Sequence, residues 1–434
     1  MAVKTKNRKP DVGWKERGFV LITIYMLLPI FLILGGSLMT YSLTDVRLAQ
    51  RSQDAAQAFY LAEAAIDEGY TWLREQAGPP GGTEALVLND GWQETLGGGY
   101  YMAIVDPDDN NPNSYIKRYT IQGLAVGDNY QAARQANLVV QIESFARYAY
   151  LSDNEISTSG STVWFRTGDH IEGPTHTNGQ FSMYGSPTFD GLVSSVSDSI
   201  NYYNPAPSGG NNPNFNEGLE LGAEEREYPS SIPSNVLEAA TASSAAYTGT
   251  TTVTLVSDGT LQITTSTGTV ETRPIPDNGV LYVNGDMYLS GTLHGQLTVA
   301  ASGDIEITNS VTYADDPETN PESEDLLGIL AGGNVKVSSA APTNVTIDAS
   351  IMALSSSFTV ENYWVGPAKG TLTVYGGINQ ARRGPVGTFY SSTGTMASGY
   401  TKSYHYDERL RNMIPPYFPL TGNYNTLGWE DASK

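Results

Sequence analysis

The 434-residue sequence contains no cysteine and only four histidines, which excludes disulfides and thiolate metal sites and leaves few imidazole ligands. Basic residues are also scarce, since 24 Lys and Arg stand against 46 Asp and Glu, for a formal net charge of −22. A chain this acidic repels phosphate backbones, so nucleic acid is not expected as a partner. Charged residues make up only 16%, whereas Gly, Tyr, Ser and Thr are abundant, a balance typical of a turn-rich β protein.

One long apolar run, residues 19–39, lies near the N-terminus and contains no charged residue. At ~1.5 Å per residue, a helix of this length spans roughly 30 Å of hydrocarbon. A secretory signal peptide is the competing interpretation, but its apolar core is usually about 7–15 residues and ends at a small-residue cleavage site. Basic residues precede the run, so the positive-inside rule places the N-terminus in the cytoplasm and the rest of the chain outside it. The sequence therefore predicts one transmembrane helix.

A second helical pattern follows between residues 43 and 76, a segment without proline. Its apolar residues recur at spacings of three and four, which predicts one helix face made of Ala55, Phe59, Ala62, Ile66, Tyr70 and Leu73. The opposite face is expected to carry Asp54, Gln57, Asp67, Glu68 and Arg74. Two roles fit such a helix: it covers its own domain, or it is partly shared with partner subunits.

Two segments, ERGFVLITIYMLLPIFLIL and AFYLAEAAIDEGY, resemble the N-terminus of PilX-type minor pilins of type IV pili and of the related K-type pseudopilins of type II secretion. The resemblance spans residues 16–70. It implies that residues 1–18 are a basic prepilin-type leader, that a prepilin peptidase cuts after Gly18, and that Phe19 is the first mature residue. Thr23 departs from the family pattern, in which a Glu neutralises the terminal amine of a neighbouring pilin. This departure argues against packing as an ordinary filament subunit.

The same resemblance implies a non-enzymatic minor pilin or pseudopilin-like subunit, which acts in filament assembly, tip display or adhesion. The chain is then anchored in the bacterial inner membrane through residues 19–39 before assembly, with its main domain periplasmic or extracellular. Other pilins or pseudopilins, a prepilin peptidase and an inner-membrane assembly platform are the implied partners. A type IV pilus and a type II secretion-like system both fit.

The helix over residues 19–76 is followed by a Gly- and Pro-rich segment and three strand-like runs, Tyr100–Asp106, Tyr115–Gln122 and Gln131–Glu143. We therefore predict a pilin-like α/β head whose β meander covers residues 77–143. The acidic loop 106–113 has oxygen ligands at alternate positions, as a calcium loop would. It lacks Gly at its sixth position and has Lys117 where a bidentate Glu is needed, so a solvated acidic turn is favoured over a calcium site.

Residues 144–401 contain many short β runs, and three of them share a turn dipeptide followed by alternating apolar residues. These repeats begin at Gly285-Asp286, Gly303-Asp304 and Gly333-Asn334. Repeats of this kind bury their apolar faces by stacking, which favours a parallel β-helix over an antiparallel sandwich, the alternative, because two-residue hairpin turns are sparse. Residues 201–250 interrupt the pattern as an insert, and the aromatic, Pro-rich residues 402–434 are expected to form a strap over one end.

The segment GDHIEGPTHTNGQFSMYGSPTFDG and the tail YHYDERL…PPYFP also resemble an uncharacterised domain that follows PilX-type N-termini. This resemblance covers much of the remaining chain. It implies no known chemistry.

Few residues are candidates for chemistry. His170 and His176 lie six residues apart beside Asp169 and Glu172, which permits a metal site, but histidines next to turns are more often polar loop groups. Polysaccharide-degrading solenoids use clustered carboxylates, for which the repeats offer Asp286, Asp304 and Glu306, although Asp after Gly is ordinary turn chemistry. We therefore predict no catalytic, cofactor-binding or metal residue. The alternative function is a surface-anchored carbohydrate-binding or polysaccharide-degrading β-helix protein, because exposed Tyr and Trp can stack on sugars, so an extracellular carbohydrate or other surface ligand remains a candidate partner.

Overall fold

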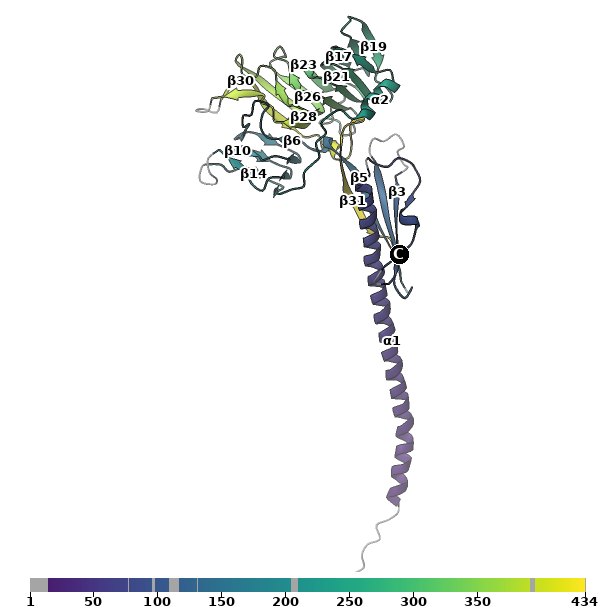
Figure 1. Ribbon diagram of the computed structural model, residues 1–434. Helices are drawn as coiled ribbons and strands as arrows, with labels where there is room; N and C mark the ends of the chain where they lie inside the picture. The colour runs from purple at the N-terminus through teal and green to yellow at the C-terminus, as the bar shows by residue number, and fades with distance from the viewer. Residues whose placement is uncertain are drawn as a thin grey trace, which may run out of the picture.

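The computed structural model describes residues 15–76, 78–95, 98–108, 117–130, 132–203, 210–390 and 395–433, with side chains from Val20 onward. One helix, α1 (Lys15–Arg74, 60 residues), carries a mainly β body at its C-terminal end, and its first half projects away from that body (Figure 1). Within the described residues, α1 alone is long and apolar enough to cross a membrane, judged by length and composition. The prediction of a mainly β chain with one long N-terminal apolar helix is thus confirmed.

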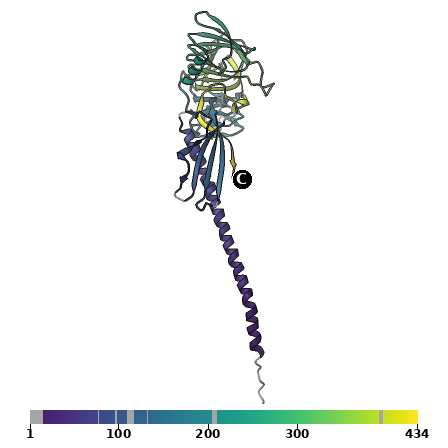
Figure 2. The same ribbon diagram turned by 90° about the vertical axis from the view of Figure 1, so that its right-hand side faces the viewer.

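The second part of α1 lies against a small antiparallel sheet, and together they form what we call the proximal domain (Figure 2). The order in this sheet is β1-β3-β4-β5-β31, with β2 added beside β3. The strands and the adjoining 3₁₀ helix are β1 (Leu86–Val87), η1 (Leu88–Asp90), β2 (Gln93–Glu94), β3 (Tyr100–Pro107), β4 (Arg118–Val126), β5 (Ala133–Ser144) and β31 (Leu420–Asp431). All three predicted strand runs are found. Residues 115 and 116 of the second run and residue 131 of the third lie outside the described part.

The last strand, β31, comes from the segment predicted to be a strap over the solenoid. It pairs antiparallel with β5, so the C-terminal residues complete the proximal sheet far from their neighbours in sequence. The segment before it contains the 3₁₀ helix η3 (Glu408–Arg411), which lies near η2 (Phe145–Arg147). The chain therefore leaves the proximal domain once, after β5, and returns to it at the end.

The contact between α1 and the proximal sheet depends on small residues. Gly123 on β4 faces the helix backbone so closely that a Cβ atom there would lie 2.0 Å from the carbonyl oxygen of Ala62. Ala62, Ile66 and Leu73 are buried, as the helical pattern predicts. Asp54, predicted on the exposed face, is instead buried, and its carboxylate accepts the backbone N–H groups of Asn129 and Ala132 at 3.0 and 2.8 Å. The buried face is thus rotated towards Asp54.

The described residues between β5 and β31 form the distal domain, in which a 22-stranded sheet and a separate three-stranded sheet are found. Its early strands are β6 (Tyr150–Asn154), β7 (Phe165–Arg166), β8 (His170–Ile171), β9 (Thr175–Thr177), β10 (Ser182–Tyr184), β11 (Thr188–Phe189), β12 (Val193–Ser195), β13 (Asn201–Tyr202), β14 (Asn214–Phe215) and β15 (Leu219–Leu221). The predicted insert then contains the helix α2 (Ser234–Ala242).

The later strands are longer and build most of the distal core. They are β16 (Ala246–Thr248), β17 (Thr251–Val256), β18 (Thr260–Thr264), β19 (Val270–Pro274), β20 (Val280–Asn284), β21 (Met287–Leu293), β22 (Gln296–Ala301), β23 (Ile305–Tyr313), β24 (Leu326–Ala331), β25 (Val335–Val337), β26 (Val345–Ala353), β27 (Phe358–Val360), β28 (Ala368–Arg382), β29 (Gly387–Phe389) and β30 (Met396–His405). Their apolar side chains form one large buried cluster.

The Gly-Asp repeats stack in register. Met287 of β21 pairs with Ile305 of β23, and Ile305 pairs with Val335 of β25, all in parallel. These three side chains are fully buried, so each repeat adds one apolar layer to the core. Antiparallel pairs also occur, between β17, β18 and β19 and between β29 and β30, so the sheet is mixed, and it is not closed. The parallel β-helix itself stays a prediction.

The early and late strands of the distal domain meet at a seam, where β6 pairs in parallel with the end of β28. From β6 the ladder continues through β9 and β12 to β15, whereas from β28 it continues through β26, β24, β22 and β20 to β16. Figure 1 shows the teal strands β10 and β14 on one side of this seam and the green strands on the other. Residues more than two hundred positions apart therefore become neighbours.

Candidate functional site

The first half of α1 exposes an almost continuous apolar surface. Every described side chain from Val20 to Gln53 is exposed, and the large ones include Leu21, Phe31 and Leu38. A surface this apolar requires a bilayer or partner chains to cover it. Gly18 and Phe19, the predicted cleavage position, lie within α1, and their processing stays a prediction.

The two histidines proposed as possible metal ligands do not share a site. His170 is exposed and its Nε2 lies 2.6 Å from Asp190 Oδ2, whereas His176 is fully buried between Ser194 and Asn178. Burial lowers the pKa of His176 to about 4, so it is neutral at pH 7. Among the described residues, no group of three or more His, Asp and Glu side chains is arranged to hold a metal ion.

The carboxylates of the repeats stabilise turns. Asp286 Oδ1 accepts the backbone N–H of Asp304 at 2.9 Å, and Asp304 Oδ1 accepts the backbone N–H of Asn334 at 2.7 Å. The ammonium of Lys336 lies 3.1 Å from Asp304 and 3.8 Å from Glu306. These contacts link one repeat to the next. They are the structural role in turns that the sequence allowed as the alternative to a catalytic role.

The predicted calcium loop is described only in part. Asp106 accepts a hydrogen bond from Gln122 Nε2 at 3.4 Å, while residues 109–113 lie outside the described part of the chain. Both interpretations of this loop therefore stay open.

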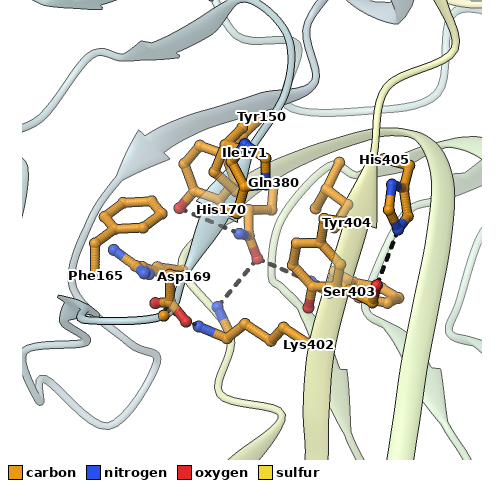
Figure 3. Close-up of a pocket in the computed structure, with 15 residues that line it drawn as sticks. Tyr150, Phe165, Asp169, His170, Ile171, Gln380, Lys402, Ser403, Tyr404 and His405 are labelled. Carbon is orange, nitrogen blue, oxygen red and sulfur yellow. Dashed lines mark hydrogen bonds and ion pairs between the residues drawn. The ribbon is translucent and has the colours of Figure 1, made fainter. Parts of the chain in front are cut away.

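A cavity of about 220 Å³ opens at the seam between the early and late strands (Figure 3). Tyr150, Phe165 and Ile171 line it from the early strands, and Gln380 and Tyr404 line it from β28 and β30. Three pairs of charged or titratable side chains join the two sides: Arg383 with Glu155 at 2.7 Å, Lys402 with Asp169 at 3.3 Å, and His405 with Glu172 at 3.0 Å. In each pair the acid comes from the segment between residues 155 and 172, and the base comes from the segment between residues 383 and 405.

Arg383 and Glu155 are the most buried of these groups, each 3% exposed. The guanidinium of Arg383 also lies 3.5 Å from the centre of the Phe165 ring. Burial lowers the pKa of Lys402, and the neighbouring Asp169 partly opposes this. The sequence pointed to Asp169 and Glu172 only as possible metal neighbours, and it gave no signal for Arg383 or Lys402, because their partners are set by the pairing of β28 with β6.

Ser403, His405 and Glu172 form a hydrogen-bonded chain that sequence reasoning missed. Ser403 Oγ lies 2.9 Å from His405 Nε2, and His405 Nδ1 lies 3.0 Å from Glu172 Oε1. This is the order of nucleophile, base and orienting acid in serine hydrolases. Acyl transfer also needs positioned N–H donors for the oxyanion, and the sequence around Ser403, Lys402-Ser403-Tyr404, is not a nucleophile elbow.

Comparisons with known proteins found two family matches. The family described as PilX N-terminal matches residues 17–67, and a domain of unknown function (DUF4900) matches residues 115–197. A comparison with curated proteins found no match. Among solved structures, the competence-associated pilin ComZ from Thermus thermophilus aligns with 87% of this chain and 97% of its own, at 12% identity and a TM-score of 0.39. The chain therefore carries a PilX-type N-terminal segment on a large C-terminal β region, which confirms the resemblance found in its sequence.

Proposed function

We propose that this chain is a non-enzymatic minor pilin or pseudopilin-like subunit of a type IV pilus or a type II secretion-like filament. The observation that carries the proposal is the agreement between the PilX N-terminal match and the shape of α1. The matched residues, 17–67, cover the exposed apolar half of the helix and the start of the half packed on the proximal sheet. Such a helix can anchor one chain in a membrane and later pack among the helices of other subunits.

Processing and location follow from the same segment. A prepilin peptidase removes residues 1–18 by cutting between Gly18 and Phe19, and the inner-membrane assembly platform then receives the chain. Residues 19–39 span the bacterial inner membrane with the N-terminus in the cytoplasm, so the proximal and distal domains lie in the periplasm or, after assembly, outside the cell.

The distal domain supports a position at the filament tip or in an initiation complex. It is a bulky unit at the end of a slender helix, and copies at every filament position would tend to collide (Figure 1). Thr23, which replaces the family's Glu, removes the carboxylate that neutralises a neighbouring pilin's amine. We also propose that the distal domain is a parallel β-helix, because its stacked Gly-Asp repeats pair in parallel and in register.

Quantitative mass spectrometry of sheared filaments tests this placement. We expect the chain to be present far below the major pilin, and we expect Thr23→Glu to leave that ratio unchanged. Near-equal stoichiometry would contradict a terminal position. A strong rise in incorporation of Thr23→Glu would show that the missing carboxylate, and not the size of the distal domain, limits entry into the shaft.

A further inference from the structure

The three-stranded sheet β13-β10-β7 stands apart from the main ladder at the seam. In the described part of the chain, β27 pairs with β25 and β7 pairs with β10, but no ladder joins β27 to β7. A cleft of about 420 Å³ lies beside β7. It is bounded by Trp164 and by Arg166 of β7, by Phe389 and Met396 of the β29–β30 hairpin, and by Tyr363.

An aromatic row leads from the open face of the three-stranded sheet to this cleft. The ring centroids of Tyr184 and Tyr203 lie 4.5 Å apart, and those of Tyr203 and Trp164 lie 5.5 Å apart. Tyr203 is 54% exposed. In the cleft, the guanidinium of Arg166 lies 4.5 Å from the centre of the Phe389 ring, which continues the row of flat groups.

The polar groups of the cleft are mostly uncharged. Six serine and threonine side chains line it, those of Ser157, Ser161, Thr162, Thr167, Thr388 and Thr401, together with Tyr363 and Tyr400. Asp169 and Lys402, which pair with each other at 3.3 Å, are shared with the seam cavity of Figure 3. The cleft thus combines flat apolar surfaces with groups that both donate and accept hydrogen bonds, the combination found in specific small-molecule sites.

We propose that the cleft and its aromatic row, Trp164, Tyr184 and Tyr203, bind a neutral carbohydrate chain. A pyranose ring presents C–H groups on its faces and hydroxyl groups around its rim, so its faces pack on aromatic rings while its rim exchanges hydrogen bonds with hydroxyl side chains. The rings of Trp164 and Tyr203, and those of Tyr203 and Tyr184, meet edge to face at 85° and 61°, so each ring offers its own contact surface to a sugar unit. This binding goes beyond the proposed filament role and holds whether or not the chain enters a filament.

The charge of the cleft and its surroundings favours a neutral carbohydrate over nucleic acid, whose bases also stack on aromatic rings. Proteins that bind single strands combine such rings with a positively charged groove. Among the described residues, the charged side chains that line the cleft are Arg166, Asp169 and Lys402. Asp169 and Lys402 neutralise each other, and the chain has a net charge of −22. A polyanion therefore gains little in the cleft and is repelled by its surroundings, whereas a neutral sugar is not.

The test uses the full chain purified in a detergent without a sugar headgroup, with cellohexaose and chitohexaose as neutral probes and polygalacturonate and oligothymidine as anionic ones. Titration calorimetry should detect at least one neutral hexamer binding to the wild-type chain. Trp164→Ala and Tyr203→Ala should each weaken this binding tenfold or more, whereas Trp164→Phe should retain most of it. Trp92→Ala is the matched control, because Trp92 is an exposed tryptophan of the proximal domain, 49% exposed, and its loss should change nothing.

Circular dichroism and thermal melting of each variant establish whether it is folded. If Trp164→Ala does not fold, Tyr203→Ala still tests the proposal, because Tyr203 is exposed and its truncation should not disturb the core. The proposal is overturned if neither hexamer binds the wild-type chain, or if binding survives both alanine substitutions. Preferential binding of polygalacturonate would overturn the neutral class. Oligothymidine binding that is lost in Trp164→Ala would assign the cleft to nucleic acid instead.

Discussion

Arg383 Nη1 donates a hydrogen bond to Glu155 Oε2 at 2.7 Å, although the two residues are 228 positions apart in sequence. Arg383 follows the end of β28 and Glu155 follows the end of β6, the two strands whose pairing joins the early and late parts of the distal domain. Tyr150 and Ser152 also contact Glu155, so the carboxylate is enclosed by polar partners as well as by the guanidinium. This buried ion pair therefore joins the ends of β6 and β28, where the early and late parts of the distal domain meet.

Arg383→Met should strongly destabilise the distal domain. The substitution leaves the carboxylate of Glu155 buried without its cation, and breaking one side of a buried pair costs about 3–5 kcal/mol. For a domain of this size the melting temperature should fall by roughly 10 °C. Thermal unfolding followed by circular dichroism measures the change.

Two comparisons make this prediction specific. The double variant Arg383→Met with Glu155→Gln should recover part of the loss, since it removes both charges. Arg411→Met, which breaks the exposed pair with Glu408, should cost less than about 1 kcal/mol. Equal effects of Arg383→Met and Arg411→Met would contradict a special role for the buried pair.

Gly123→Ala should loosen the proximal domain. The added methyl group would lie 2.0 Å from the carbonyl oxygen of Ala62, and helix backbone cannot move aside as a side chain can. Overpacking of this kind costs about 1–3 kcal/mol or more, so α1 should separate from β4 and become easier to cleave by protease. Gly428→Ala on β31, where a Cβ would meet open space, is the control. Unchanged protease resistance of Gly123→Ala would refute the tight contact.

Local patterns in the sequence predicted much of this fold. The apolar run and the helical spacing predicted α1, and alternating apolar residues predicted β3, β4 and β5. The Gly-Asp and Gly-Asn dipeptides predicted where β21, β23 and β25 begin, because a turn followed by alternation is a signal contained within a few residues.

Long-range pairings could not be predicted in the same way. Nothing near Leu420 indicates that β31 completes the sheet beside β5, because a strand's partner is not encoded in its own alternation. Asp54 resembles an ordinary exposed helix residue until the β4–β5 turn places two backbone N–H groups against it. The seam cavity and the aromatic cleft likewise depend on the pairing of β6 with β28, and no repeat or motif in the sequence predicts that pairing.

Processing should occur between Gly18 and Phe19. N-terminal sequencing of the mature chain is expected to begin at Phe19, and Gly18→Val should retain the leader because the peptidase pattern requires the glycine. Gly13→Val, within the leader but away from the cleavage position, should be processed normally. Finding Met1 or Ala2 at the N-terminus of the mature wild-type chain would contradict the prediction.

The Ser403–His405–Glu172 chain should be structural and not catalytic. From the proposed non-enzymatic role we expect the purified wild-type chain to hydrolyse p-nitrophenyl acetate no faster than Ser403→Ala does. Ser403→Ala should also leave folding nearly unchanged, since it removes one hydrogen bond, worth about 0.5–1.5 kcal/mol. A hydrolysis rate that falls in Ser403→Ala and in His405→Gln alike would show that the chain is an enzyme.

His176 should make the stability of the distal domain depend on pH. Burial lowers the pKa of this histidine from 6.5 to about 4, and the nearby Arg226 acts in the same direction while Asn178 and Glu143 oppose it. Between these two pH values the unfolded chain binds a proton that the folded chain does not. The free energy of unfolding should therefore be highest above pH 6.5, fall by roughly 3 kcal/mol as the pH drops to about 4, and stay level below that.

Another buried group acts in the opposite direction, so a variant is needed to isolate this effect. Burial raises the pKa of Asp348 to about 6, which makes the folded chain bind the extra proton and raises stability as the pH falls from 6 towards 4. His176→Gln should be less stable than wild type at pH 7, because it loses the contact with Ser194. It has no imidazole at this position, so it does not lose stability through protonation of that group as the pH falls. The difference in melting temperature between wild type and His176→Gln should therefore shrink between pH 7 and pH 4. A curve for His176→Gln that runs parallel to wild type would show that the His176 ring is not buried as a neutral group.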